Sequence, residues 1–132
     1  MLAAYSQRGL RWVVDYDCER PRNLVVYQSE SVQLDSFTSR ESGFWNVHIC
    51  YSNQVSLRNL DVQNSAGPST DGINIDSSQQ VRVEGCTVFF NDDNICVKAG
   101  RGAEAQLLAK TVRDITIRHC TPAERFRHHA GQ

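Results

Sequence analysis

The chain has 132 residues and a formal net charge of -1, with 14 basic and 15 acidic side chains. That length allows one domain that buries roughly two-thirds of its unfolded surface, and the balanced charge gives no overall field that would attract nucleic acid or an anionic membrane. No apolar run approaches the roughly 18 residues of a membrane span, and residues 1–12 lack the apolar core of a signal peptide. The sequence therefore predicts neither a nucleic-acid nor a membrane partner. It leaves the compartment open, because the protein either stays in the cytoplasm or has a native N-terminus further upstream.

In chain order, four segments repeat one apolar pattern. They cover residues 31–37, 54–62, 80–88 and 114–120. Each follows a polar turn and has apolar residues at its second, fourth and seventh positions, whereas the spacing between successive segments varies from 23 to 34 residues. A constant unit separated by variable inserts is the signature of a repeat fold.

A second short strand precedes each of the last three segments. These strands show period-two alternation and cover residues 45–50, 72–76 and 94–99. Two apolar columns, meaning residues at the same position of successive repeats, result: Val47, Ile73 and Ile95, and then Ile49, Ile75 and Val97. Stacked repeats would bury each apolar row on the next, so the sequence predicts an all-β, right-handed parallel β-helix. A leucine-rich repeat would need an L-x-x-L-x-L signature, which is absent, and a β-sandwich would not give repeating columns.

We expect about four to five rungs, meaning turns of the helix, within a single partial domain over residues 1–132. Residues 10–16 are a candidate further strand, and residues 121–132, which abandon the strand pattern, are expected to be an atypical, disordered tail. The five cysteines show no C-x-x-C spacing, which argues against a zinc site and favours buried free thiols. Neither a metal nor a cofactor is predicted.

Acidic residues cluster where the second and third of the short strands begin. In the column alignment Asp71 and Asp93 stack below Trp45, and Asp92 lies in the column beside them with Phe44. Adjacent rungs lie about 4.8 Å apart. Residues that are distant in the sequence are therefore expected to become neighbours on the turns that precede the strands.

The outward-facing positions of the same strands form two polar columns: His48, Asn74 and Cys96, and then Cys50, Asp76 and Lys98. The second column predicts an ion pair between Asp76 and Lys98 on adjacent rungs. Carboxylates, amides, a cation and an aromatic platform together are typical of a carbohydrate-binding groove.

Three neighbouring carboxylates cannot all ionise freely at neutral pH, so the pKa of at least one should be raised. A protonated carboxyl can donate to a leaving oxygen while an ionised one activates water, which is the division of labour in glycoside hydrolysis. Two other interpretations stay open at this point. The acidic residues could be turn formers in a solvated loop, or they could bind calcium.

Two motifs carry a family resemblance. STDG at residues 69–72 and NDDN at residues 91–94 resemble the Asn-Thr-Asp-Gly and Asp-Asp hallmarks of glycoside hydrolase family 28, the polygalacturonase and rhamnogalacturonase family. The likeness extends over residues 9–120. It implies a right-handed parallel β-helix that hydrolyses α-galacturonosyl linkages of pectin with inversion.

The resemblance also implies roles for individual residues. Asp92 would be the general acid, and Asp71 and Asp93 would hold and activate the nucleophilic water. Lys98 would contact a uronate carboxylate of the polysaccharide or oligogalacturonide substrate, unless it pairs with Asp76. Two further residues of the strip are candidates for substrate binding, namely Asn74 and His48.

The chain departs from the family pattern in several places. Ser69 replaces the Asn of the first motif, and Asn74 stands where many members carry Asp. The family continues with Gly-His-Gly and Arg-x-Lys motifs, whereas neither follows Cys120, and His128 and His129 lack flanking glycines. We therefore expect a segment of a longer helix that is weak or inactive alone, monomeric if complete, and aggregation-prone as a fragment because open solenoid ends expose strand edges.

Two alternative functions stay open. A non-catalytic carbohydrate-binding or structural β-helix module would keep the groove without the chemistry. A calcium-dependent pectate lyase would use the same architecture with a calcium cluster and an arginine base. The sequence does not decide between endo and exo cleavage, or between galacturonan and rhamnogalacturonan.

Overall fold

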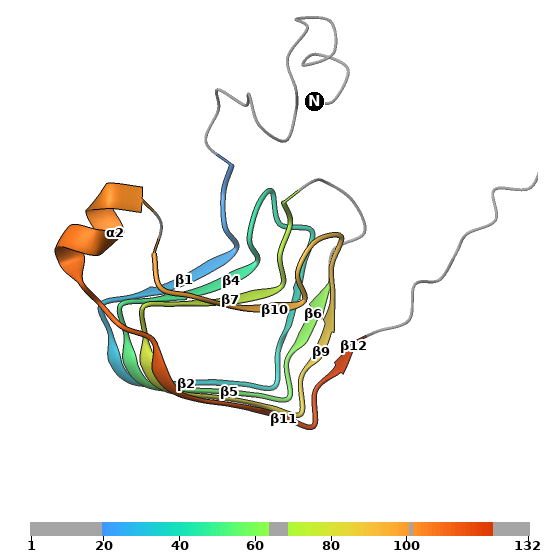
Figure 1. Ribbon diagram of the computed structural model, residues 1–132. Helices are drawn as coiled ribbons and strands as arrows, with labels where there is room; N and C mark the ends of the chain where they lie inside the picture. The colour runs from blue at the N-terminus through green and yellow to red at the C-terminus, as the bar shows by residue number, and fades with distance from the viewer. Residues whose placement is uncertain (1–19, 64–68, 101, 123–132) are drawn as a thin grey trace, which may run out of the picture.

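The computed structural model describes residues 20–63, 69–100 and 102–122, and within them the chain coils through three parallel sheets (Figure 1). Each sheet has four strands, and each rung contributes one strand to every sheet. The predicted parallel β-helix is confirmed, with four rungs in this part of the chain. The candidate strand at residues 10–16 lies outside the described residues.

The strands recur in the same order on every rung. The first sheet contains β1 (Leu24–Tyr27), β4 (Val47–Cys50), β7 (Ile73–Asp76) and β10 (Ile95–Lys98). The second sheet contains β2 (Glu30–Asp35), β5 (Asn53–Arg58), β8 (Gln79–Glu84) and β11 (Arg113–Arg118). The third sheet contains β3 (Thr38–Arg40), β6 (Asp61–Gln63), β9 (Thr87–Phe89) and β12 (Thr121–Pro122).

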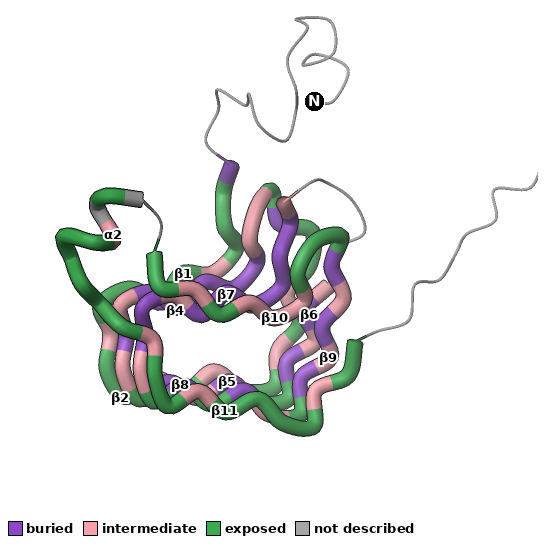
Figure 2. Tube along the Cα trace, in the orientation of Figure 1, coloured by how far each residue is buried: buried purple, intermediate pink, exposed green. Residues whose placement is uncertain are grey.

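The core is the stack of inward-facing side chains from the three sheets. Strand register pairs Val47 with Ile73 and Ile73 with Ile95, as the apolar columns predict. The inward-facing apolar residues of β4 and β7 on the two middle rungs are fully buried (Figure 2). Val97 on the last rung is 45% exposed. Burial is thus most complete where a neighbouring rung covers both faces, as expected for a solenoid.

The corners between sheets repeat as regularly as the strands. Left-handed backbone recurs at the same corner of every rung, at Ser36, Asn59, Gly85 and His119. At the corner between the first and second sheets, stacked serines replace strand pairing: the Ser29 amide donates to Ser52 Oγ, and the Ser52 amide to Ser78 Oγ. These bonds satisfy one half-buried and one buried backbone donor at positions outside the strands.

One element interrupts the coil. Helix α2 (Gly102–Leu108) lies between β10 and β11 and accounts for the longest spacing between repeats. The sequence analysis did not predict it, although its segment, GAEAQLL, is rich in strong helix formers. None of the described helices is long and apolar enough to cross a membrane.

The last rung ends within the segment that was expected to be an atypical tail. Thr121 and Pro122 form β12 and pair with β9. The rest of that segment, residues 123–132, with the two histidines considered above, lies outside the described residues.

Candidate active site

Asp71 is the most buried acidic residue among the expected catalytic groups. It lies just before β7, and only 3% of its surface is exposed. Its backbone oxygen accepts the Asn46 amide of the rung before. The Gly72 amide in turn donates to the Asp93 oxygen of the rung after at 2.8 Å. Backbone hydrogen bonds to the rungs on both sides therefore fix the position of the Asp71 backbone, from which its side chain extends.

Asp92 and Asp93 lie on the turn before β10, and both are exposed. The Asp92 amide donates to the Thr70 oxygen at 3.3 Å, so this turn stacks directly on the one that carries Asp71. A carboxylate oxygen of Asp71, one of Asp93 and the Cys96 Sγ all lie within 4.8 Å of one another. The structure thus brings the carboxylates of Asp71 and Asp93 together, and places beside them the thiol of Cys96, which the sequence analysis had not assigned to the site.

The pKa of Asp71 is raised above its usual value. Burial is the largest cause, the Lys98 ammonium opposes it, and the negative charge of Asp92 adds to it. The predicted rise of one carboxyl pKa therefore agrees with the structure. Its main cause, however, is desolvation of Asp71 rather than repulsion between neighbouring carboxylates. Burial also raises the pKa of the Cys96 thiol, with a further contribution from Asp93.

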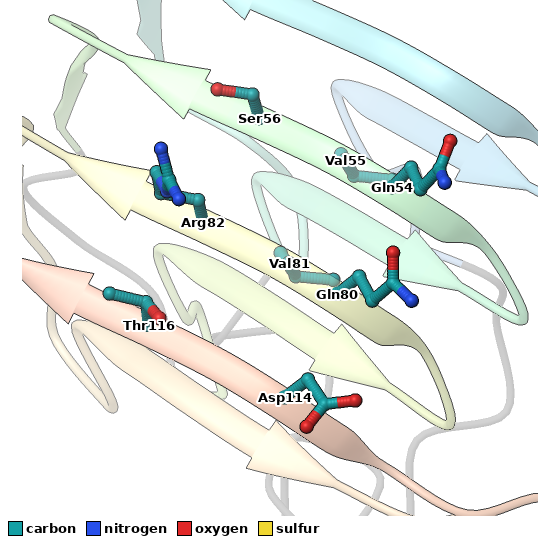
Figure 3. A pocket seen from close by; sticks show the side chains of 8 residues that line it. All are labelled: Gln54, Val55, Ser56, Gln80, Val81, Arg82, Asp114 and Thr116. Atoms are coloured by element: carbon teal, nitrogen blue, oxygen red, sulfur yellow. The ribbon is translucent and has the colours of Figure 1, made fainter.

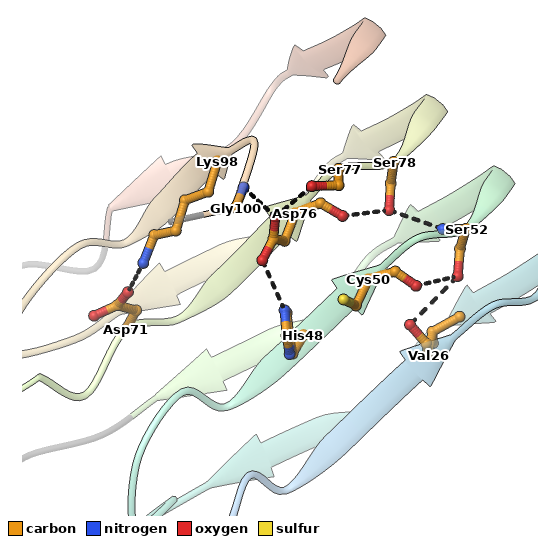
Figure 4. Close-up of polar contacts among 10 residues, drawn as sticks. All are labelled: Val26, His48, Cys50, Ser52, Asp71, Asp76, Ser77, Ser78, Lys98 and Gly100. Atoms are coloured by element: carbon orange, nitrogen blue, oxygen red, sulfur yellow. Dashed lines mark hydrogen bonds and ion pairs between the residues drawn. The ribbon is translucent and has the colours of Figure 1, made fainter. Parts of the chain in front are cut away.

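Lys98 pairs with Asp71 across adjacent rungs, its Nζ lying 2.9 Å from Oδ2 (Figure 4). The predicted ion pair between Lys98 and Asp76 is therefore wrong, although the two are register partners. Asp76 Oδ1 already accepts the Ser77 hydroxyl and the Gly100 amide. The buried Asp71 carboxylate has the greater need for a counter-charge, because burial of an unpaired charge is costly.

An aromatic pair with cations around it borders this ion pair. The rings of Phe44 and Trp45 stack with centroids 4.9 Å apart. Lys98 Nζ lies 3.9 Å from the Trp45 centroid, and the Arg22 guanidinium lies 4.9 Å from it. The expected aromatic platform is therefore present, and it carries positive charge. Arg22 was missed by the sequence analysis because nothing in its local pattern places it on Trp45.

The two other candidates for substrate binding, Asn74 and His48, are more buried than residues of an open binding groove would be. Asn74 is completely buried, and both polar atoms of its amide lack a hydrogen-bond partner in the described part of the chain. The amide lies near enough to lower the pKa of Asp71 a little, but short of hydrogen-bond geometry. His48 is 8% exposed and packs edge-on against Trp45. Direct contact of either residue with a substrate stays a prediction.

Two groups on β4 have strongly shifted pKa values. Burial, followed by the charge of Arg22, lowers the pKa of His48 to about 4, so the imidazole is neutral at physiological pH. Burial raises the pKa of the Cys50 thiol to about 11, with a smaller contribution from Asp76. These two side chains and the Asp76 carboxylate form a second cluster beside the candidate active site.

A hollow of about 550 Å³ lies elsewhere, on the outer face of the second sheet (Figure 3). Its lining residues are Gln54, Val55, Ser56, Gln80, Val81, Arg82, Asp114 and Thr116. It contains a single carboxylate and no second acid–base group. The chemistry expected from the sequence therefore belongs to the first sheet.

Comparison with known proteins agrees with this geometry. The family model for glycosyl hydrolases family 28 matches residues 12–122. A protein described as a probable polygalacturonase from Vitis vinifera is 30% identical over 103 residues, which is 77% of this chain and 21% of the relative. A probable polygalacturonase from Arabidopsis thaliana is 28% identical over 94 residues, or 70% of this chain and 20% of the relative. The chain thus spans about a fifth of the length of these relatives, and it belongs to glycosyl hydrolase family 28.

Proposed function

We propose that this chain carries the acidic centre of a pectin-type glycoside hydrolase that cleaves α-galacturonosyl linkages with inversion. The observation that supports it most directly is the approach of Asp71 and Asp93 to within 4.8 Å, with Asp92 on the same turn. Inversion needs one carboxyl group to protonate the leaving oxygen and another to activate water on the opposite face of the sugar.

Asp92 is the general acid of this proposal, because it is exposed and can approach the glycosidic oxygen from the solvent side. Asp71 and Asp93 hold the nucleophilic water and activate it by accepting its proton. Asp71 must be ionised for that role, and Lys98 keeps it so by offsetting the effect of burial on its pKa. The same lysine ammonium is placed to attract the carboxylate of a uronate unit.

The substrate class follows from the charge around the aromatic pair. Arg22 and Lys98 present cations beside the Trp45 ring. A uronate unit carries a negative charge that these cations would pair with. An acidic polysaccharide or oligogalacturonide is therefore a better fit than a neutral glycan.

The test is a reducing-end assay on polygalacturonate in the presence of EDTA, with this chain and with a longer protein that contains it. Asp92→Asn should lower the rate about 10²–10⁴-fold, the usual contribution of a general acid. Asp114→Asn, an exposed acid on the second sheet, is the control and should leave the rate unchanged. Equal activity of Asp92→Asn and the parent protein would refute the assignment of Asp92.

The same assay separates the alternatives. Substrate binding without new reducing ends, in the longer protein as well, would indicate a non-catalytic module. An unsaturated product that requires calcium would indicate a lyase, although the thiol between Asp71 and Asp93 is a poor ligand for a hard cation. Weak activity, aggregation of the isolated chain and a monomeric complete protein stay predictions, which sedimentation of the purified proteins would check.

A further inference from the structure

Three potential metal ligands converge beside the candidate active site. His48 and Cys50 lie two residues apart on β4 and therefore point to the same face of the first sheet. Strand register places Asp76 of the next rung opposite Cys50. As a result, one nitrogen of His48, the Cys50 Sγ and a carboxylate oxygen of Asp76 all lie within 4.8 Å of one another.

The His48 imidazole is buried, and within the described residues its Nε2 is not satisfied by a hydrogen bond. Only 8% of His48 is exposed, and Nε2 has no hydrogen-bond partner in the described structure. The nearest carboxylate oxygen, Asp76 Oδ2, is 3.8 Å away, which is too long for a hydrogen bond. Two ligands that share one zinc ion, with bonds of about 2.0–2.2 Å each, lie roughly 3.4 Å apart at the tetrahedral angle. The observed separation thus fits a shared ion better than a direct contact.

Asp76 is held in the orientation that such a site needs. Its Oδ1 accepts the Ser77 hydroxyl at 2.8 Å and the Gly100 amide at 2.9 Å. These two bonds leave Oδ2 directed toward His48 and Cys50 (Figure 4). Hydrogen bonds of this kind orient metal ligands in known sites and are a large part of their affinity.

We propose that His48, Cys50 and Asp76 form a binding site for a divalent transition-metal ion of the zinc type. Imidazole nitrogen and thiolate sulfur select Zn²⁺ and its neighbours over calcium or magnesium. Three protein ligands leave a fourth position for water. The ion would link the second and third rungs. The thiolate and the carboxylate would offset the two charges of the ion, and Arg22, Lys98 and Lys110 add positive charge nearby.

This proposal goes beyond the hydrolase chemistry and revises the expectation that the chain binds no metal. A search for C-x-x-C spacing could not find this site, because it contains a single cysteine and takes its carboxylate from the next rung. It is also distinct from the group of Asp71, Asp93 and Cys96, which belongs to the candidate active site.

The test uses Co²⁺ as a spectroscopic probe, added to the purified, reduced chain. A thiolate ligand gives a near-ultraviolet sulfur-to-cobalt charge-transfer band, and a tetrahedral site gives intense visible bands. We expect both, at one ion per chain, with loss on addition of Zn²⁺. Cys50→Ser should abolish the charge-transfer band. Absence of the band in the parent chain, or an unchanged band in Cys50→Ser, would overturn the proposal.

Cys96→Ser is the matched control, because it makes the same replacement of sulfur by oxygen in the neighbouring cluster of Asp71, Asp93 and Cys96. The band should persist in this variant. Loss of the band in Cys96→Ser and its retention in Cys50→Ser would place the ion between Asp71 and Asp93 and refute the assignment. Far-ultraviolet circular dichroism of both metal-free variants shows that they fold as the parent chain does.

A more conservative change tests the orientation of Asp76. Ser77→Ala removes one of the two hydrogen bonds to Oδ1 and leaves all three ligands in place. Loss of such a supporting partner typically weakens metal binding about 10–100-fold. Cobalt affinity that is equal in Ser77→Ala and in the parent chain would exclude this supporting role, and Asp76→Asn would then show whether the carboxylate binds the ion at all.

Discussion

Lys98 Nζ bonds Asp71 Oδ2 at 2.9 Å, although the strand partner of Lys98 on the preceding rung is Asp76. The pair joins a buried carboxylate of one turn to a half-buried cation of the next. It also brings the ammonium onto the Trp45 ring. One side chain thus connects the acidic centre to the aromatic platform.

Removal of this cation should raise the pKa of Asp71 further. Burial raises that pKa and Lys98 lowers it, so Lys98→Met leaves burial unopposed. Asp71 would then ionise only at a higher pH. The acidic limb of the pH profile of any activity that needs the Asp71 carboxylate would therefore move to higher pH. A ¹³C NMR titration of the side-chain carboxyl measures the shift directly.

Lys110→Met is the control for that titration. Lys110 lies over the Tyr51 ring, with Nζ 5.0 Å from its centroid, and is not among the groups that shift Asp71. The Asp71 titration should be the same in this variant and in the parent chain. An Asp71 pKa that is unchanged in Lys98→Met would show that the ion pair does not form in solution.

Gly72 next to Asp71 has no room for a side chain. A Cβ there would overlap the Asn94 oxygen and Val88 Cγ1, and would come within 2.9 Å of Phe90 Cδ2. Because the Asn94 oxygen is backbone, the two rungs must separate to admit it. We expect Gly72→Ala to lower the free energy of unfolding by about 1–3 kcal/mol, as overpacked cores do, and to move Asp71 away from Asp93. Urea denaturation measures the first effect.

Gly85 provides the contrast. Its φ of +63° matches that of Asn59, which occupies the same corner one rung earlier with a φ of 53°. Asparagine tolerates this conformation, and the atom that a new Cβ would meet belongs to the flexible Asn59 side chain. Gly85→Asn should therefore change the unfolding free energy by no more than about 0.5 kcal/mol. A loss as large as that of Gly72→Ala would contradict this view of the corner.

Core substitutions should depend on the rung that carries them. Ile75 is fully buried between two rungs, whereas Ile117 on the last rung is 43% exposed. Ile75→Ala should cost about 2–5 kcal/mol and Ile117→Ala clearly less, in the same denaturation experiment. If Ile75→Ala does not fold, Ile75→Val should still cost about 0.5–1.5 kcal/mol. Equal losses at the two positions would mean that the last rung is covered in solution.

Cys96 offers a way to locate substrate without measuring turnover. Its thiol lies within 4.8 Å of both Asp71 and Asp93 and is partly exposed. Because its pKa is raised, it should react with iodoacetamide slowly at neutral pH and faster at alkaline pH. A bound oligogalacturonide should slow the reaction several-fold, as measured by mass spectrometry of the labelled peptides.

Cys120 is the internal control for this experiment, since it is also partly exposed but lies beyond the second sheet on the last rung. Its labelling should not respond to the ligand. Equal protection of both thiols would indicate aggregation or general stabilisation, and protection of neither would count against binding at the acidic centre.

The sequence determined the architecture of this protein. Period-two alternation sets which side chains enter the core, and equal units in successive repeats set which ones stack, so the columns of Val47 and Ile49 agree with the observed register. The approach of Asp71 and Asp93 followed from the same alignment, because backbone pairing between rungs leaves little freedom to residues next to a strand. Helix α2 was missed, since a variable insert has no counterpart in the other repeats.

Only the tertiary structure decided the partners of the polar side chains. A long side chain such as Lys98 can reach several acceptors, and the choice depends on which carboxylate is more buried and which is already bonded. The burial of His48 and the position of Arg22 on Trp45 likewise depend on what covers the outer face of the first sheet. Sequence order fixes backbone neighbours through repeating hydrogen bonds, whereas desolvation and side-chain geometry, which arise only in the folded chain, fix the charges and their pairs.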